Sequence, residues 1–264
     1  MGNKEQLTQG VSDLELSYFE LQAYIGTTKH MGGLETTKEL VDLCHIDEGT
    51  YVLDVGCGVG ATTCYLAKTC GCRVLGVDLR EAMVALSNER AQKLGVTGLV
   101  EFRVADAQDL PFDDATFDAV LCESVVTFIK DKQRVVNELA RVVKPGGYVG
   151  FNEEMWLKPP PAQIIEHVKR TWDIKPGIQM AEAWELLLQR AELRDIVVRP
   201  YKVNPRREAS QVKRYSFGDM FRMFWRTLLL YIKRPDFRAY MKQQRRLPRN
   251  VFEYLGYAVF VGRK

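Results

Sequence analysis

Three features are missing from this sequence of 264 residues, and each absence excludes a class of protein. No apolar run approaches the roughly 18 residues that a membrane-spanning helix needs. The six cysteines contain no Cys-x-x-Cys pair, so a zinc site has little support. The first residues, Met-Gly-Asn-Lys-Glu-Gln, do not resemble a signal peptide. We therefore expect a cytoplasmic protein with reduced thiols and no metal.

Charge is distributed unevenly along a chain of otherwise ordinary composition. With 46% hydrophobic and 27% charged residues, the chain lies near the globular average, which excludes disordered, collagenous and coiled-coil proteins. The segment from Ser210 to Asn250 holds eleven basic and two acidic residues, so it carries +9 while the rest of the chain carries −6. The eleven are Lys213, Arg214, Arg222, Arg226, Lys233, Arg234, Arg238, Lys242, Arg245, Arg246 and Arg249.

Short apolar runs alternate with helical patterns from Tyr51 onward, which predicts an α/β fold with a doubly wound, mostly parallel sheet. Strands are expected at 51–55, 73–77, 99–104, 117–122, 148–151 and 196–199. Helices are expected at 60–70, 81–94, 131–143 and 180–191. Residues 254–262 read as a last strand, which we expect to be antiparallel because no helix precedes it in the same rhythm.

The whole chain, 1–264, is interpreted as one domain with two additions to its core. Residues 1–45 form an N-terminal helical cover of two helices, joined by a turn from Gly26 to Gly33. Residues 46–203 and 251–264 form the core. Residues 204–250 form a basic, aromatic lid insertion, which should leave the sheet beside the ligand edge because a parallel strand precedes it.

A glycine-rich turn is the strongest local signal. In Val-Leu-Asp-Val-Gly-Cys-Gly-Val-Gly, residues 52–60, a strand ends in a turn that opens a helix. Gly56, Gly58 and Gly60 allow a sharp bend and the close approach of a ligand. Asp78, at the end of the second strand, can accept hydrogen bonds from ribose hydroxyls. These features indicate a nucleoside ligand, and a dinucleotide also fits them.

Two further acids separate the candidate nucleosides. Asp54 precedes the first glycine, where a carboxylate would repel a pyrophosphate and suits a ligand that bears an ammonium group. In Val-Ala-Asp-Ala-Gln-Asp-Leu-Pro-Phe, residues 104–112, Asp106 can accept from the exocyclic amine of adenine, and the Ala107 amide can reach a ring nitrogen.

These motifs resemble those of the class I S-adenosylmethionine-dependent methyltransferases from Tyr51 to Asn152, including Arg-Val-Val-Lys-Pro-Gly-Gly-Tyr at 141–148. The resemblance implies S-adenosylmethionine as cofactor and a seven-stranded sheet whose last strand is antiparallel. It also implies roles for individual residues: Asp54 and the glycines at 56, 58 and 60 hold the methionine part, Asp78 with Leu79 the ribose, and Asp106 with Ala107 the adenine.

Two segments are similar to small-molecule members of this family. His-Met-Gly-Gly-Leu-Glu-Thr-Thr, residues 30–37, is similar to the segment that closes over the cofactor in phosphoethanolamine methyltransferases. Tyr24 and His30 are therefore assigned to the cover and expected to contact the cofactor. Cys-Glu-Ser, residues 122–124, is similar to an element of tocopherol, sterol and prenyl-diphosphate methyltransferases, although Val-Val-Thr-Phe follows it in place of the histidines often found there. The resemblance implies a small-molecule methyl acceptor.

Glu123 is the first candidate for catalysis because it follows a strand whose carboxyl end faces the cofactor's methyl group. It could orient the acceptor, remove a proton or stabilise a cation, or it could only contact cofactor or solvent. His30 is a second candidate base, with a purely structural hydrogen bond as the alternative. Glu153 and Glu154 end the fifth strand, where one could contact substrate or both could be solvated.

The insertion leaves three interpretations open. Phe217, Phe221 and Phe224 recur at helical spacing, so the helix could pack its apolar stripe on the core with its arginines in water. Alternatively, residues 210–249 could rest on an anionic membrane and deliver a lipophilic acceptor. An RNA-binding arm is the third interpretation, disfavoured because the aromatic stripe is continuous. We expect a monomer or weak dimer acting on a small lipophilic or anionic molecule; an RNA methyltransferase and a cofactor-binding protein without turnover are the alternatives.

Overall fold

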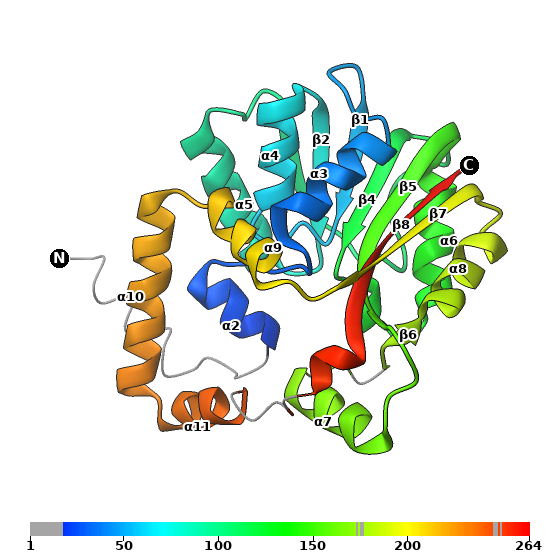
Figure 1. The fold of residues 1–264 in the computed structure, drawn as a ribbon. Helices are drawn as coiled ribbons and strands as arrows, with labels where there is room; N and C mark the ends of the chain where they lie inside the picture. The colour runs from blue at the N-terminus through cyan, green and yellow to red at the C-terminus, as the bar shows by residue number, and fades with distance from the viewer. Residues whose placement is uncertain (1–17, 173, 175–176, 245–247, 249) are drawn as a thin grey trace.

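The computed structural model describes residues 18–172, 174, 177–244, 248 and 250–264. Within this part of the chain, eight strands form one sheet in the order β3-β2-β1-β4-β5-β8-β7, with β6 paired to β5 (Figure 1). The strands are β1 (Tyr51–Val55), β2 (Arg73–Asp78), β3 (Val100–Val104), β4 (Phe117–Glu123), β5 (Val143–Trp156), β6 (Gln179–Met180), β7 (Arg194–Lys202) and β8 (Leu255–Arg263). β1 to β6 pair in parallel, and β8 is antiparallel to both β5 and β7.

Helices cover both faces of the sheet, as the alternating pattern predicts. On one face lie α3 (Gly33–Leu43), α4 (Ala61–Cys70) and α5 (Glu81–Leu94). On the other lie α6 (Lys132–Val142) and α8 (Ala181–Arg190), whose Leu139 and Trp184 are fully buried against the strands. The central strands are buried on both faces, which is why β1 and β4 are almost wholly apolar in sequence. The predicted α/β class is confirmed.

Three features of the core differ from the expectation. β6, a pair of residues beside β5, raises the expected seven strands to eight. β5 begins at Val143, ahead of the expected strand at 148–151, because the Lys-Pro-Gly-Gly stretch belongs to the strand, with a register shift against β4. A helix that was not predicted, α7 (Ala162–Trp172), follows three prolines; Ile164 and Val168 form its buried stripe.

The N-terminal cover and the insertion pack against each other. α2 (Tyr18–Ile25) lies between the sheet and α10 (Phe217–Lys233), which stands at the outer edge of the molecule (Figure 1). The insertion also holds α9 (Pro205–Ala209), η2 (Ser210–Arg214) and α11 (Pro235–Gln244), and η3 (Val251–Glu253) precedes β8. β7 is parallel to β1 because both β5 and β7 oppose β8, so the insertion leaves the sheet at its carboxyl edge, as expected. Arg245, Arg246 and Arg249 lie outside the described residues.

Candidate active site

A cavity of about 240 Å³ opens at the carboxyl ends of β1 to β4. Its walls come from the glycine turn after β1, the residues that follow β2, β3 and β4, and α2 with the segment after it. Six residues predicted to bind cofactor line it: Gly56, Gly58, Asp78, Leu79, Asp106 and Ala107. The four others, Asp54, Gly60, Tyr24 and His30, are not among its lining residues. The motifs that were read separately in the sequence therefore meet at one hollow.

Bare backbone forms one wall of the cavity, at Gly56 and Gly58. Both glycines have positive φ, +73° and +55°, a conformation that other residues rarely adopt. A Cβ atom on Gly58 would lie 2.1 Å from the Thr28 side chain, and one on Gly56 would lie 2.2 Å from Val125. These positions therefore need glycine twice over, for the backbone angle and for the close approach of the cover and the loop after β4.

The acids after β2 and β3 present carboxylates at the cavity. Asp78 Oδ2 accepts from the Gly58 amide and Oδ1 from the Arg80 amide, both at 3.0 Å, which fixes the carboxylate beside the turn. Burial raises the pKa of Asp78. Asp106 Oδ1 accepts from the Gln108 amide at 2.9 Å. Each carboxylate retains acceptor capacity, so the residues present fit a ligand that donates from a ribose and from an amine.

Asp54 lies beneath the turn instead of on the cavity wall. It is 2% exposed, and Thr63 Oγ1 donates to its Oδ2 at 2.5 Å. Burial raises the pKa of Asp54 to about 7, against the hydrogen bond from Thr63. The expected contact of Asp54 with an ammonium group is therefore not direct in this arrangement. The residue supports the turn from below, and Gly60 (φ +69°) packs against Ser87 and Phe102, away from the cavity.

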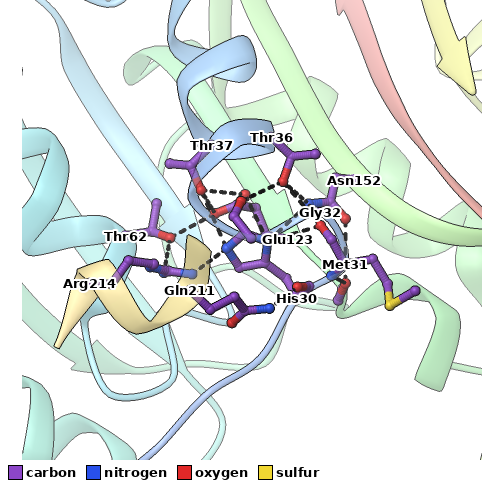
Figure 2. A network of polar contacts seen from close by, with 12 residues as sticks. His30, Met31, Gly32, Thr36, Thr37, Thr62, Glu123, Asn152, Gln211 and Arg214 are labelled. Atoms are coloured by element: carbon purple, nitrogen blue, oxygen red, sulfur yellow. Dashed lines mark hydrogen bonds and ion pairs between the residues drawn. The ribbon is translucent and has the colours of Figure 1, made fainter. Parts of the chain in front are cut away.

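Glu123 is the centre of a buried polar network (Figure 2). Thr37 Oγ1 donates to Oε1 at 3.0 Å, and Thr62 Oγ1 donates to Oε2 at 2.7 Å. The threonines come from α3 and α4, so the cover, the first core helix and the end of β4 meet at this carboxylate. Glu123 also lines the cavity. Its partners are hydroxyl groups, which can rotate toward another acceptor when a ligand arrives.

His30 is held in the same network, behind the cavity. Its ring is 5% exposed, and Arg214 of η2 donates to Nε2. Because arginine can only donate, the contact at Nε2 favours the neutral tautomer with its proton on Nδ1. Nδ1 faces the Met31 carbonyl at 3.3 Å and Glu123 Oε1 at 3.5 Å, and the Asn152 amide nitrogen lies 3.2 Å from the same atom. Burial lowers the pKa of His30 to about 4, opposed by Glu123 and supported by Arg214. With Nε2 occupied and the ring outside the cavity lining, His30 is placed to position Glu123 rather than to accept a proton from a substrate.

Arg214 joins the insertion to this network, and no motif in the sequence announces it. Its second terminal nitrogen donates to Thr62 Oγ1 at 2.6 Å, while Gln211 of η2 donates to the His30 carbonyl. Tyr215 holds the cover nearby, since its hydroxyl accepts from the Thr28 amide at 3.0 Å. The only available signal was the general one that the insertion begins at the ligand edge. Contacts between residues about 180 positions apart carry no local pattern.

Tyr24 lies on the far side of the cover from the cavity. Its hydroxyl is buried with no hydrogen-bond partner among the described residues, and the Arg226 guanidinium lies 5.8 Å from its ring centre. Arg226 also donates to the Tyr24 carbonyl at 2.9 Å. Tyr24 therefore contacts the insertion, and the residues of α2 that face the cavity are Phe19 and Gln22.

Glu153 shapes the loop after β4 and is not solvated. It is fully buried, and its carboxylate accepts from the amides of the three residues that follow Ser124, at 2.8–3.0 Å. Lys132 holds the other end of η1 (Val126–Phe128), donating to three carbonyls at 2.9–3.2 Å. Burial raises the pKa of Glu153 and lowers that of Lys132. This clamp positions Phe128 and Ile129 on the cavity wall.

Glu154 is the second half of the expected pair, and it too is buried. Its residue is 8% exposed, and its Oε2 has no hydrogen-bond partner in the described structure. Burial, with the charge of Glu153 next to it, raises the pKa of Glu154 to about 7. A solvated pair is therefore wrong for both residues.

The sequence predicts neither a metal site nor a membrane-spanning helix, and the described ranges bear on both. There, no group of three or more histidine, cysteine or acidic side chains is arranged to hold a metal ion. The six cysteines are free thiols, and five of them are buried. No helix in the same ranges is both long and apolar enough to cross a bilayer.

Known proteins resemble this chain in sequence and in fold. Residues 53–151 match the methyltransferase domain family. Phosphoethanolamine N-methyltransferase 1 of Arabidopsis thaliana is 33% identical over 178 residues, which is 67% of this chain and 34% of the relative. 27-O-demethylrifamycin SV methyltransferase of Amycolatopsis mediterranei is 32% identical over 54% of this chain and 52% of its own length. The chain thus spans about a third to a half of these relatives.

The fold has counterparts among solved structures. Phosphoethanolamine N-methyltransferase 2 of Haemonchus contortus, in complex with S-adenosyl-L-methionine, superimposes with a TM-score of 0.72 and 20% identity, over 98% of this chain and 60% of that one. This likeness confirms the Rossmann-like methyltransferase fold. With the family match over 53–151, it supports a class I S-adenosylmethionine-dependent methyltransferase whose cofactor is S-adenosylmethionine.

Proposed function

We propose that this protein transfers the methyl group of S-adenosylmethionine to a small acceptor held between Glu123 and the N-terminal cover. One observation carries the proposal: Glu123 lines the same cavity as Asp78 and Asp106. The carboxylates suited to a nucleoside and the acid suited to an acceptor therefore share one space. When bound, the cofactor supplies an electrophilic methyl group on a sulfonium, so the protein needs chiefly to orient the acceptor and exclude water.

Three features of the chain would carry out these tasks. Asp78 with Leu79 would hold the ribose, Asp106 with Ala107 the adenine, and the turn at Gly56 and Gly58 the methionine part; each of these residues lines the cavity. Phe19 on the cover and Phe128 after β4, whose ring centres lie 4.9 Å apart, would together exclude water from the cavity.

Glu123 is proposed to orient the acceptor and, where the acceptor atom carries a proton, to receive it. The two threonine hydroxyls and the His30 ring hold the carboxylate in place from behind. The carboxylate thus reaches the cavity on one side while its position is set on the other. His30 and Arg214 are positioning residues in this proposal.

The walls of the cavity favour an acceptor with an apolar body and an anionic group. Met83, Val125 and Ile129 provide apolar surface, and Lys29 and Arg80 provide positive charge at the same cavity. Arg80 is partly neutralised by Glu20 at 3.4 Å, and Lys29 by Glu208 at 3.8 Å. An anionic group could compete for either cation, which is why we propose a lipophilic or anionic small molecule.

The test has two stages. Calorimetry with S-adenosylmethionine and with its demethylated product should show binding of both. Incubation with a methyl-labelled donor and cell extract, separated into lipid and aqueous phases, should then move label into a small molecule. Binding without label transfer would favour the alternative of a cofactor-binding protein without turnover. Absence of binding to either compound would overturn the proposal.

The remaining expectations about partners are carried as proposals. We propose a cytoplasmic protein, monomeric or weakly dimeric, with peripheral contact between residues 210–249 and an anionic membrane. The RNA alternative has no specific support, because Arg214 and Arg226 are bonded to the cover and the exposed aromatic residues of α10 lie on one uninterrupted face.

A further inference from the structure

The apolar face of α10 points to solvent. Seven of its large apolar side chains are at least 36% exposed, and Phe217 reaches 81%. They are Phe217, Met220, Phe221, Phe224, Trp225, Tyr231 and Ile232. Their spacing of three or four residues places them on one side of the helix, together with half-buried Leu228 and without a charged residue between them. We call these seven residues the outer face of α10. Of the three interpretations of the insertion, the one in which this stripe packs on the core is therefore wrong.

The inner side of α10 is the more polar one. Asp219 closes a capping box with Ser216 and lies 3.8 Å from Arg90 of α5, and Arg226 bonds to the cover. Leu230, fully buried, packs with Leu21 of α2 and Phe237 of α11. Because these contacts already hold the helix, the outer face is not needed to attach α10 to the protein. An apolar patch of this kind on a folded protein marks an interaction site.

The segment that carries the outer face has an excess of positive charge. Between residues 210 and 244 the chain has eight basic and two acidic residues. Both acids are paired within the protein, Asp219 with Arg90 and Asp236 with Arg234 at 2.6 Å. By contrast, Lys213, Lys233 and Lys242 are exposed and have no ion-pair partner among the described residues. The segment from 210 to 244 therefore combines an exposed apolar helix face with unpaired cations on the same part of the chain.

We propose that α10 docks on an anionic lipid bilayer, with its outer face at the boundary between headgroups and acyl chains and its lysines toward the lipid phosphates. Trp225 and Tyr231 are residue types that favour this boundary, and basic residues near an anionic surface are attracted to it. A second copy of the chain fits less well, because a two-fold interface would bring together two segments that each carry an excess of positive charge.

The docked helix would lie next to the active site. α10 packs on α2, and α2 contributes Phe19 and Gln22 to the cavity. Tyr215, just before the helix, holds the cover at Thr28. A lipophilic acceptor dissolved in the bilayer would thus meet the cover directly. This route rests on the proposed function, whereas the docking itself does not.

Co-sedimentation with vesicles tests the docking. The full-length protein should bind vesicles of phosphatidylcholine mixed with phosphatidylserine, should not bind phosphatidylcholine alone, and should be released by salt. The combined variant Phe221→Ser, Phe224→Ser, Trp225→Ser should bind at least a hundredfold more weakly, because it removes three aromatic side chains that the bilayer would bury. A matched control, Leu186→Ser with Phe252→Ser, alters exposed apolar residues elsewhere and should bind like the wild type.

A residue-specific signal keeps the test independent of folding. The fluorescence of Trp225 should shift to shorter wavelength on vesicle addition, and the shift should disappear in Trp225→Phe. Cofactor affinity by calorimetry should be unchanged in all these variants, which separates failure of docking from failure of the proposed function. The proposal would be overturned if the wild-type protein did not bind anionic vesicles, or if the triple serine variant bound them like the wild type. A dimer that the triple variant abolishes, with no vesicle binding, would assign the face to a second copy.

Discussion

Glu123 ends β4 and Glu153 lies three residues before the end of the neighbouring β5; both are buried, and they differ in what donates to them. Glu153 accepts from three backbone amides and is sealed from the cavity. Glu123 accepts from two hydroxyl groups and lines the cavity. Backbone donors cannot turn to another partner without moving the chain, whereas hydroxyl donors can. The donors around a buried acid, more than its burial, therefore separate an acid that holds structure from one that is available to a ligand.

The largest effect is expected at Glu153. Glu153→Ala leaves three amides of the loop without their acceptor, and we expect a loss of about 3 kcal/mol or more in the free energy of unfolding. Chemical denaturation measures it. Glu166→Gln, which removes an exposed carboxylate that is 3.8 Å from Lys169, should change stability by no more than about 0.5 kcal/mol. If Glu153→Ala is as stable as the wild type, η1 does not depend on the clamp.

The second effect should appear in turnover and not in stability. In Glu123→Gln the amide can still accept from Thr62 but cannot take up a proton, so we expect methyl transfer to slow on the order of 100-fold while cofactor affinity is kept. Single-turnover transfer and calorimetry measure the two quantities. Glu123→Asp should recover part of the rate. Full activity in Glu123→Gln would leave this carboxylate with no chemical role and remove its contrast with Glu153.

A third prediction concerns the ring that faces Glu123. The pKa of His30 falls to about 4 in the folded protein, against about 6.5 in the unfolded chain. Between these pH values the unfolded chain binds a proton at this ring and the folded protein does not. His30 therefore costs stability progressively as pH falls from about 6.5 to about 4. Lowering the pH from about 7.5 to about 5 should stabilise His30→Gln relative to the wild type by about 2 kcal/mol.

Denaturation curves at the two pH values measure this difference. Asp54 and Glu154 have raised pKa values and act in the opposite sense, but they are common to both proteins and cancel in the comparison. A difference that stays constant with pH would mean that His30 titrates normally, and its assignment as a neutral positioning group would be lost.

The smallest effect tests the wall opposite Glu123. Gly58→Ala and Gly95→Ala both place a Cβ at positive φ, +55° and +69°, at a backbone cost of about 1 kcal/mol. Only the first meets another atom, Thr28 at 2.1 Å, while nothing lies within 4 Å of the second. We expect cofactor binding to be about tenfold weaker in Gly58→Ala and unchanged in Gly95→Ala, measured by calorimetry. Equal affinities would show that the cover does not press on the turn.

The positions of site residues were predictable where they lie in a short motif at the end of a strand. The glycine turn, Asp78 and Asp106 meet at the cavity because the carboxyl ends of parallel strands share one edge. Asp54 shows the limit of this reasoning. The sequence places it near the end of a strand, but does not say whether its side chain reaches the cavity or stays buried beneath the turn. Its position two residues before Gly56 placed it at the right edge but not on the cavity surface.

Contacts that span the chain were not predictable. Arg214 reaches His30 across 184 positions, and only the folded cover and insertion bring them together. The direction of α10 is a second case. Its periodicity predicts a helix with one apolar face, and periodicity is the same whether that face meets a core or solvent. The helix was therefore predictable, whereas the surroundings of its apolar face were left open among three interpretations.

The strand order has a consequence for how this protein is made. β8 lies between β5 and β7, although it follows both in the chain. During synthesis, β5 and β7 emerge with their edges exposed and must wait for residues 255–263 before the sheet can close. An exposed strand edge is a template for pairing with another chain. A ribosome that stalls before residue 255 would thus release a product prone to aggregate, with the cofactor half of the sheet already assembled.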